Sequence, residues 1–389
     1  MKNISPYVDL SFHSLNKYGE ELCGDKVEVI KSDDRTIVVL ADGLGSGVKA
    51  NILATLTSKI MITMLDKGAS LIETIDTITN TLPVCQVRQI AYSTFTILDI
   101  DKDLNCKIIE FDNPPAFVLR KHKLLKLEKE KLLSSNKQVM VTEFKLSVGD
   151  EIVVVSDGVI HAGVGKFLNH GWEWSHVAEY LENQELNSAD KLNRRLLEAC
   201  QKLYDDTPGD DTTSVVVKIR LPQQIQLLTG PPTDPSLDQR LIEGFMKKHG
   251  KKIICGGTAA NIVSRELKRD IESELTYIDP KIPPTAKIRG IDLVTEGVLT
   301  LKMVHDELKI INTSCIEPVL NKEDGVSRLL KLLIEDSTHI NFYLGHAINP
   351  AHQNPDFPVE LSIKVKIVEG IIEELRKMGK IVKLYDTDR

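Results

Sequence analysis

The chain lacks several features that would assign it to common classes of protein. Its six cysteines are scattered over 389 residues with no CxxC pair, so we expect free thiols. No stretch reads as long and apolar enough to span a membrane, and the N-terminus lacks the hydrophobic core of a signal peptide. From these absences we expect a cytoplasmic protein with no membrane partner.

Positively charged residues are also fewer than negatively charged ones. The formal net charge is −7 and the sequence pI is about 5.9, which argues against nucleic acid as a partner. Hydrophobic residues make up 42% of the chain, as expected of a globular protein, and the length predicts two or three domains. Internal repeats and low-complexity tracts are missing as well.

Aspartates lie at the tips of short Val- and Ile-rich segments that read as buried strands. Asp25 precedes a strand around Val27–Ile30, and Asp42 follows a strand at Thr36–Leu40. If the polar turn at residues 31–35 joins these strands, antiparallel pairing places Asp25 opposite Asp42. Both carboxylates then emerge from the same end of one hairpin.

A second pair of aspartates follows the same logic. Asp157 ends the strand Ile152–Val155, and Asp210 begins a strand at Ser214–Val217. Two sheets packed face to face would bring both pairs to one rim, where four carboxylates require bound cations or large pKa shifts. The alternative for any single Asp-Gly pair is an ordinary turn after a strand. The repeated arrangement favours a metal site.

The first half of the chain carries an ordered set of motifs. They are Asp42-Gly-Leu-Gly-Ser-Gly47 followed by Ala50, then Asn113-Pro-Pro-Ala-Phe117, Ser156-Asp-Gly158 and Asp210-Asp-Thr-Thr213. Residues 1–221 thereby resemble the PPM superfamily of metal-dependent protein phosphatases, in the bacterial branch typified by stage II sporulation protein E. The resemblance implies an α+β fold, an αββα β-sandwich, that hydrolyses phosphoserine and phosphothreonine in proteins with a water activated by two Mn²⁺ or Mg²⁺ ions.

The resemblance also implies roles for individual residues. Asp42 would bridge the two metals and the Gly43 carbonyl would add an oxygen ligand. Asp157 and Asp210 would hold one ion, and Asp25 would support the other, so that Asp42, Asp157 and Asp210 form the catalytic set. Asp211 is a weaker candidate. The implied substrate is a small bacterial regulator such as a phosphorylated anti-sigma-factor antagonist. The alternative is a regulatory binding protein that keeps the fold but catalyses little.

Two helical regions follow the glycine-rich turn. Residues 51–67 and 69–82 carry apolar side chains at helical spacing, among them Ile52, Leu56 and Ile60. Further helix is expected over residues 171–204. Both tryptophans, Trp172 and Trp174, lie in that stretch, where we interpret them as packing residues.

The pattern of predicted strands and helices changes near Leu221–Gln224. Over residues 226–389 short strands, one of them expected at 275–278, alternate with helices, which predicts a smaller α/β domain with a mainly parallel sheet. We expect a regulatory or ligand-binding role, with an unknown ligand. The turn Gly256-Gly-Thr258 is a weak anion-site candidate or a plain capped turn. A soft-metal site from Cys255, Cys315, His346 and His352 matches no known ligand spacing.

Overall fold

The computed structural model describes residues 5–32, 34–81, 93–134, 137–274, 281–313, 320, 322–347 and 359–388. The chain divides into two compact units. The first spans Pro6–Arg220, and the second comprises the described residues from Leu221 onward. Each unit is described by itself below.

The first unit contains two antiparallel sheets. The five-stranded sheet has the order β1 (Tyr7–Leu15), β11 (Thr212–Arg220), β10 (Glu151–Val155), β6 (Phe117–Arg120) and β7 (Lys123–Leu124). The six-stranded sheet has the order β2 (Asp25–Lys31), β3 (Arg35–Gly43), β4 (Ser93–Asp101), β5 (Asn105–Phe111), β9 (Lys137–Lys145) and β8 (Glu130–Ser134). Their central strands are rich in Val and Ile, which suit a strand buried on both faces.

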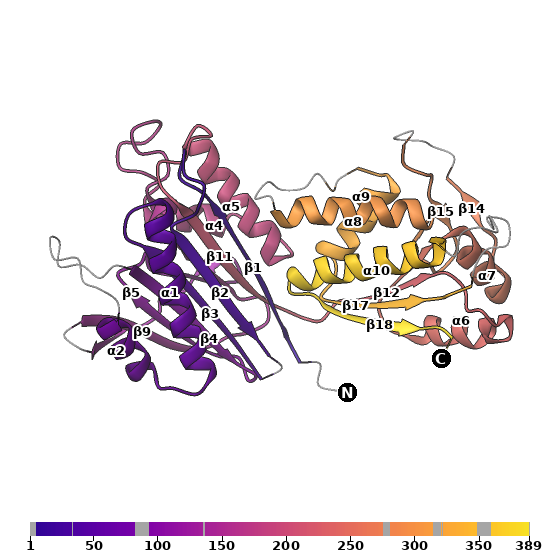
Figure 1. Ribbon diagram of the computed structural model, residues 1–389, viewed down its shortest axis with the longest axis horizontal. Coiled ribbons are helices and arrows are strands. Elements are labelled where there is room, and N and C mark those ends of the chain that lie inside the picture. Colours follow the sequence, from indigo (N-terminus) through magenta and orange to yellow (C-terminus); the bar gives the residue numbers. More distant parts are fainter. Residues whose placement is uncertain are drawn as a thin grey trace. The chain divides into compact units, whose positions relative to one another are not determined.

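Three hydrophobic layers hold this unit together. Residues such as Val38, Val154 and Val215 fill the space between the two sheets. On the outer face of the six-stranded sheet pack α1 (Gly47–Asp66) and α2 (Leu71–Thr81), as Figure 1 shows. On the outer face of the five-stranded sheet pack α4 (Trp174–Glu182) and α5 (Ala189–Leu203). The predicted αββα sandwich is therefore confirmed.

Helix α1 buries a different face from the one its large apolar residues suggest. The side chains against β2 and β3 are mostly small, with Ala50 and Ala54 fully buried beside Met61. Ile52 and Leu56 are 51% and 46% exposed. Among the described residues, α1 is the one helix that is long and apolar enough by length and composition to cross a membrane, contrary to the sequence-based expectation. A helix that packs on a sheet in a protein core can be just as long and as apolar as one that crosses a membrane.

The second unit is built on a seven-stranded mixed sheet. Its order is β14 (Glu272–Ser273), β15 (Ala286–Lys287), β16 (Leu293–Thr295), β13 (Lys251–Cys255), β12 (Gln224–Thr229), β17 (His339–Leu344) and β18 (Ile381–Asp386). The last five in this order pair in parallel, and β14 and β15 add an antiparallel edge. The mainly parallel sheet is thus confirmed, whereas the strand expected at 275–278 lies outside the described residues.

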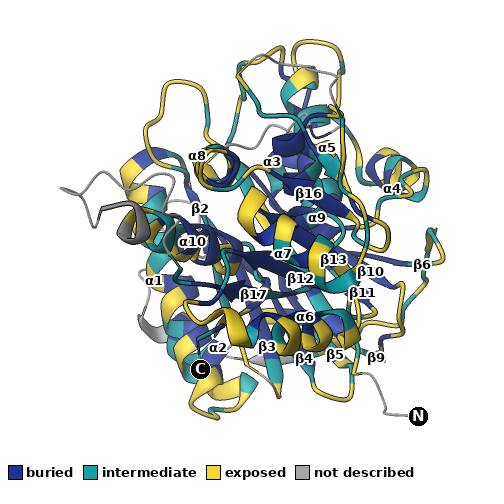
Figure 2. Cartoon of the chain, turned by 90° about the vertical axis from the view of Figure 1, so that its right-hand side faces the viewer, coloured by how far each residue is buried: buried dark blue, intermediate teal, exposed yellow. Residues whose placement is uncertain are grey.

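Helices cover both faces of this sheet, as in other parallel sheets. One face is covered by α8 (Val298–Thr313), α9 (Gly325–Ile334) and α10 (Val359–Lys377). The other is covered by α6 (Asp238–Lys247), which follows the short 3-10 helix η1 (Pro235–Leu237), and by α7 (Gly257–Leu267). Figure 2 shows β12, β13 and β17 as buried strands beneath partly exposed helices. The arrangement is a doubly wound α/β layer.

Candidate metal centre

The hairpin β2–β3 carries the first two aspartates. Its register aligns Asp25 with Asp42, so the predicted pairing is confirmed. The Gly43 N–H donates to the Gly24 carbonyl at 3.1 Å and continues the ladder past the aspartates. The Ser93 hydroxyl donates to the Asp42 carbonyl at 2.9 Å from β4. The end of the hairpin is thus held by hydrogen bonds on both sides of Asp42.

The β10–β11 pair carries the other two aspartates, and its strands are antiparallel neighbours as predicted. Asp157 is the first residue of the short helix α3 (Asp157–Ile160), directly after β10, and Asp210 lies just before β11. Two hydrogen bonds join the strand ends: the Ser156 N–H donates to the Thr213 carbonyl at 2.9 Å, and the Thr213 N–H donates to Ser156 Oγ at 2.8 Å.

The two pairs meet at one edge of the sandwich. A Cβ atom built on Gly24 would lie 2.8 Å from Asp211 Oδ2, which shows how closely the hairpin approaches the start of β11. Cys23 Sγ lies 3.9 Å from Thr213 Oγ1 across the same junction. Because Asp25 follows Gly24 directly, the carboxylates of both sheets face a common space.

Burial and repulsion between neighbouring carboxylates raise the pKa values of Asp25, Asp42 and Asp210. The pKa of Asp42 is raised to about 9, first by burial and then by the charges of Asp25, Asp157 and Asp210. The pKa of Asp25 is raised to about 7, mainly by burial, although the hydroxyls of Ser156 and Thr213 act in the opposite direction.

Asp210 behaves in the same way, since burial and the charge of Asp157 raise its pKa. Two oxygens at this edge, Asp25 Oδ2 and Asp211 Oδ2, are buried without a hydrogen-bond partner among the described residues. Such oxygens are costly unless a cation or a proton satisfies them. The donor set therefore fits hard divalent cations, which prefer carboxylate and carbonyl oxygens.

Two glycines allow the backbone to approach closely at this site. A Cβ atom on Gly43 would lie 2.1 Å from the Ala50 carbonyl oxygen in α1, and one on Gly158 would lie 2.1 Å from the Asp211 carbonyl oxygen. These contacts are with backbone atoms, which cannot move aside as a flexible side chain can. Each Asp-Gly pair thus requires glycine for steric reasons.

Gly43→Ala should therefore destabilise the first unit and displace the Gly43 carbonyl from the carboxylate cluster. We expect the free energy of unfolding to fall by about 1–3 kcal/mol, the usual cost of overpacking. The measurement is chemical denaturation of the full chain, with Gly257→Ala as the matched control because its Cβ would meet nothing within 4 Å. Equal stability of the two variants would contradict the steric argument.

The structure adds residues that the sequence did not single out. Asn113 was part of a motif without a role, and it now links two β4 side chains. Its Oδ1 accepts from Thr94 Oγ1 at 2.9 Å, and its Nδ2 donates to Thr96 Oγ1 at 3.1 Å. Thr94 is the register partner of Asp42, so Asn113 supports the strand beside that aspartate. Its position directly after β5 was the available signal.

Asp211 and Lys17 form a second support. The Lys17 N–H donates to Asp211 Oδ1 at 3.0 Å, while Asp211 Oδ2 is the unpartnered oxygen described above. The Tyr204 hydroxyl donates to the Gly158 carbonyl at 2.7 Å and fixes the turn after Asp157.

The structure describes some of the candidate site residues of the second unit but not all of them. Gly256, with φ of 123°, is the N-cap of α7, and no side chain caps the helix. His346 lies with Asp386 and Asp388, whose ligand atoms are all within 4.8 Å of one another. Cys315 and His352 of the soft-metal hypothesis lie outside the described residues.

The αββα sandwich and the edge of converging carboxylates define the first unit as a PP2C-type phosphatase domain. Residues 32–220 match the family described as stage II sporulation protein E. A curated relative, stage II sporulation protein E of Bacillus subtilis (strain 168), is 26% identical over 208 residues. The match covers 52% of this chain and 24% of the relative.

Solved structures with related folds were also found. One contains the PP2C phosphatase domain and a fragment of the regulatory domain of SpoIIE from Bacillus subtilis; it is 23% identical, with a TM-score of 0.49, and covers 55% of this chain and 62% of that one. Another contains the RsbU and RsbW domains of a Mycobacterium tuberculosis protein; it is 17% identical, with a TM-score of 0.47, and covers 62% and 70% of the two chains.

Proposed function

We propose that the first unit hydrolyses phosphoserine and phosphothreonine on a bacterial regulatory protein, with two Mn²⁺ or Mg²⁺ ions as cofactors. The observation that carries the proposal is the convergence of Asp25, Asp42, Asp157 and Asp210 at one edge of the sandwich, with buried oxygens that lack partners among the described residues. The match of residues 32–220 to the family described as stage II sporulation protein E supports the same reaction.

The residues have distinct roles in this proposal. Asp42 would bridge the two cations, and the adjacent Gly43 carbonyl would add a neutral oxygen ligand. Asp157 and Asp210 would hold one cation, and Asp25 would support the other. When bound, the cations supply positive charge that offsets the phosphate dianion and lowers the pKa of water. The close packing of the backbone at Gly43 and Gly158 would help to fix the positions of the adjacent aspartates.

The substrate and its location are finer parts of the same proposal. The chain spans about a quarter of the length of its curated relative, so the activity and partners of that whole protein do not transfer directly. We propose a small phosphorylated regulator, of the anti-sigma-factor antagonist type, as the substrate. We propose that the reaction takes place in the cytoplasm.

The test is hydrolysis by the full chain of p-nitrophenyl phosphate and of a phosphoserine-containing regulator, with Mn²⁺ or Mg²⁺ added after metal removal. We expect turnover that requires the divalent cation and that a chelator abolishes. A folded, metal-binding chain that turns over neither substrate would contradict the proposal. It would favour instead a regulatory protein that uses the phosphatase fold for binding.

A further inference from the structure

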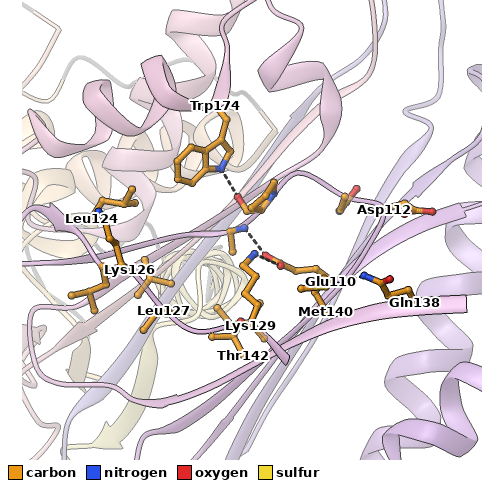
Figure 3. Close-up of a pocket in the computed structure, with 16 residues that line it drawn as sticks. Glu110, Asp112, Leu124, Lys126, Leu127, Lys129, Gln138, Met140, Thr142 and Trp174 are labelled. Carbon is orange, nitrogen blue, oxygen red and sulfur yellow. Dashed lines mark hydrogen bonds and ion pairs between the residues drawn. The ribbon is translucent and has the colours of Figure 1, made fainter. Parts of the chain in front are cut away.

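A cavity of about 920 Å³ lies in the first unit, and no step of the proposed reaction uses it (Figure 3). Strands β5 and β9 of the six-stranded sheet line one side, and β6 of the five-stranded sheet lines the other. The segment 124–129, which leads from β7 toward β8, and Trp174 complete the wall. The cavity therefore lies between the sheets at the end of the sandwich where β9 and β6 are found. Its size falls within the range of about 300–1,000 Å³ typical of small-molecule sites.

Most of the wall is apolar. Val118, Leu124, Leu127 and Met140 contribute aliphatic surface, and Trp174 contributes an aromatic face. Trp174 is held in one orientation, because its ring stacks on Phe117 with centroids 4.7 Å apart and its Nε1–H donates to the Pro115 carbonyl at 2.7 Å. The tryptophan that the sequence suggested was a packing residue is thus also a rigid cavity wall. A fixed aromatic surface of this kind suits the apolar body of a ligand.

The wall also carries an ion pair between Glu110 and Lys129. Glu110 is buried, with one oxygen accepting from the Ala116 N–H at 2.7 Å and the other from Lys129 Nζ. This ion pair satisfies the carboxylate but uses only one of the three Lys129 N–H donors. Figure 3 shows the Lys129 side chain reaching Glu110 across the centre of the cavity.

Thr142 adds a second polar group. The residue is 4% exposed and lines the cavity from β9. Its hydroxyl can donate a hydrogen bond to a polar group that the cavity receives. Lys126 also lines the cavity and has no ion-pair partner in the described part of the chain. Lys126, Lys129 and Thr142 therefore offer donors to a ligand, beside the carboxylate of Asp112, which also lines the cavity.

We propose that this cavity binds a small amphipathic anion. Its apolar body would lie against Leu124, Leu127 and Trp174, and its anionic group would accept hydrogen bonds from Thr142 Oγ1 and Lys129 Nζ. Burial of the apolar body provides the main driving force, and the charged acceptor gains hydrogen bonds from donors that line the cavity. Ligand binding here goes beyond phosphate ester hydrolysis and does not depend on it.

The test uses 8-anilinonaphthalene-1-sulfonate, an aromatic anion that fluoresces in apolar sites, with the full chain under native conditions. We expect saturable binding of one probe per chain. The matched neutral probe, N-phenyl-1-naphthylamine, should bind at least about threefold more weakly because it lacks the sulfonate acceptor. Thr142→Val keeps the side-chain shape and removes the hydroxyl, so it should weaken sulfonate binding by about three- to tenfold.

A second variant tests the location of the binding site. Ala116→Phe places a ring inside the cavity and should weaken binding of both probes by at least about tenfold. Val148→Phe adds the same ring at an exposed position outside the cavity wall and should leave binding unchanged. If Ala116→Phe does not fold, as judged by circular dichroism, Leu127→Trp serves the same purpose. Unchanged binding in the filled variant, or no saturable binding to the wild type, would overturn the proposal. Two results together would overturn the preference of the cavity for an anion. The two probes would bind equally tightly, and Thr142→Val would bind the sulfonate probe as tightly as the wild type does.

Discussion

Asp42→Asn should lower the Mn²⁺- or Mg²⁺-dependent turnover of the full chain by at least about 100-fold, the usual effect of removing one preorganised electrostatic contact. The substitution keeps the side-chain shape but removes the negative charge that is surrounded by three other carboxylates. Asp157→Asn should have a comparable effect because its charge reaches both Asp42 and Asp210. The measurement is kcat/KM against metal concentration for each variant.

The control for this prediction is Asp103→Asn, which changes an exposed aspartate in the turn between β4 and β5. That turn lies at the opposite end of β4 from the residue paired with Asp42. The control should keep wild-type turnover. More than about one tenth of wild-type kcat/KM in Asp42→Asn would remove this residue from the catalytic set, since a tenfold loss corresponds to only about 1.4 kcal/mol.

The second large effect concerns stability without metal. In a chelator, the wild type should lose stability as the pH rises from about 4 to about 9, relative to Asp42→Asn. The folded-state pKa of Asp42 is about 9 and that of Asp25 about 7, both above the ordinary value of 3.8. The unfolded chain therefore releases these protons first, and ionisation favours unfolding. The stabilisation of the folded state by these two protonated carboxyl groups is fully present below pH 4 and is lost as the pH rises through 7 and 9.

Thermal unfolding tests this prediction. At pH 8 without metal, Asp42→Asn should melt at least about 2–4 °C above the wild type, the shift expected for about 1 kcal/mol in a unit of this size. Saturating Mn²⁺ should reverse the order, because a ligand at 100 times its Kd stabilises the native state by about 2.7 kcal/mol. Parallel pH profiles for the wild type and Asp42→Asn would show that the pKa of Asp42 is not raised in the folded protein.

The sequence predicted the features that are set by local periodicity. Alternation in strands and a short polar turn are enough to set the register of a hairpin, which is why the pairing of Asp25 with Asp42 could be anticipated. The same reasoning gave the β10–β11 pair and the alternating strands and helices of the second unit.

The features that the sequence did not predict depend on packing between elements. The first half of the buried face of α1 consists of small residues such as Ala50 and Ala54, because the helix lies close to the sheet there, and the larger residues Ile52 and Leu56 remain exposed. The bridge from Asn113 to Thr94 joins β4 to the loop after β5, and no local pattern encodes it. The space beside Trp174 arises between two sheets, and its wall combines residues 108–142 with Trp174 from a later helix.

The position of β1 has a consequence for how the protein is made. β1 begins at Tyr7 and pairs with β11, which ends at Arg220. During synthesis the first strand therefore emerges from the ribosome about 200 residues before its hydrogen-bonding partner. Until then, its unpaired backbone groups are open to other nascent chains or to chaperones. Truncated chains that stop before Thr212 should accumulate as aggregates or be degraded, whatever the sequence of the second unit.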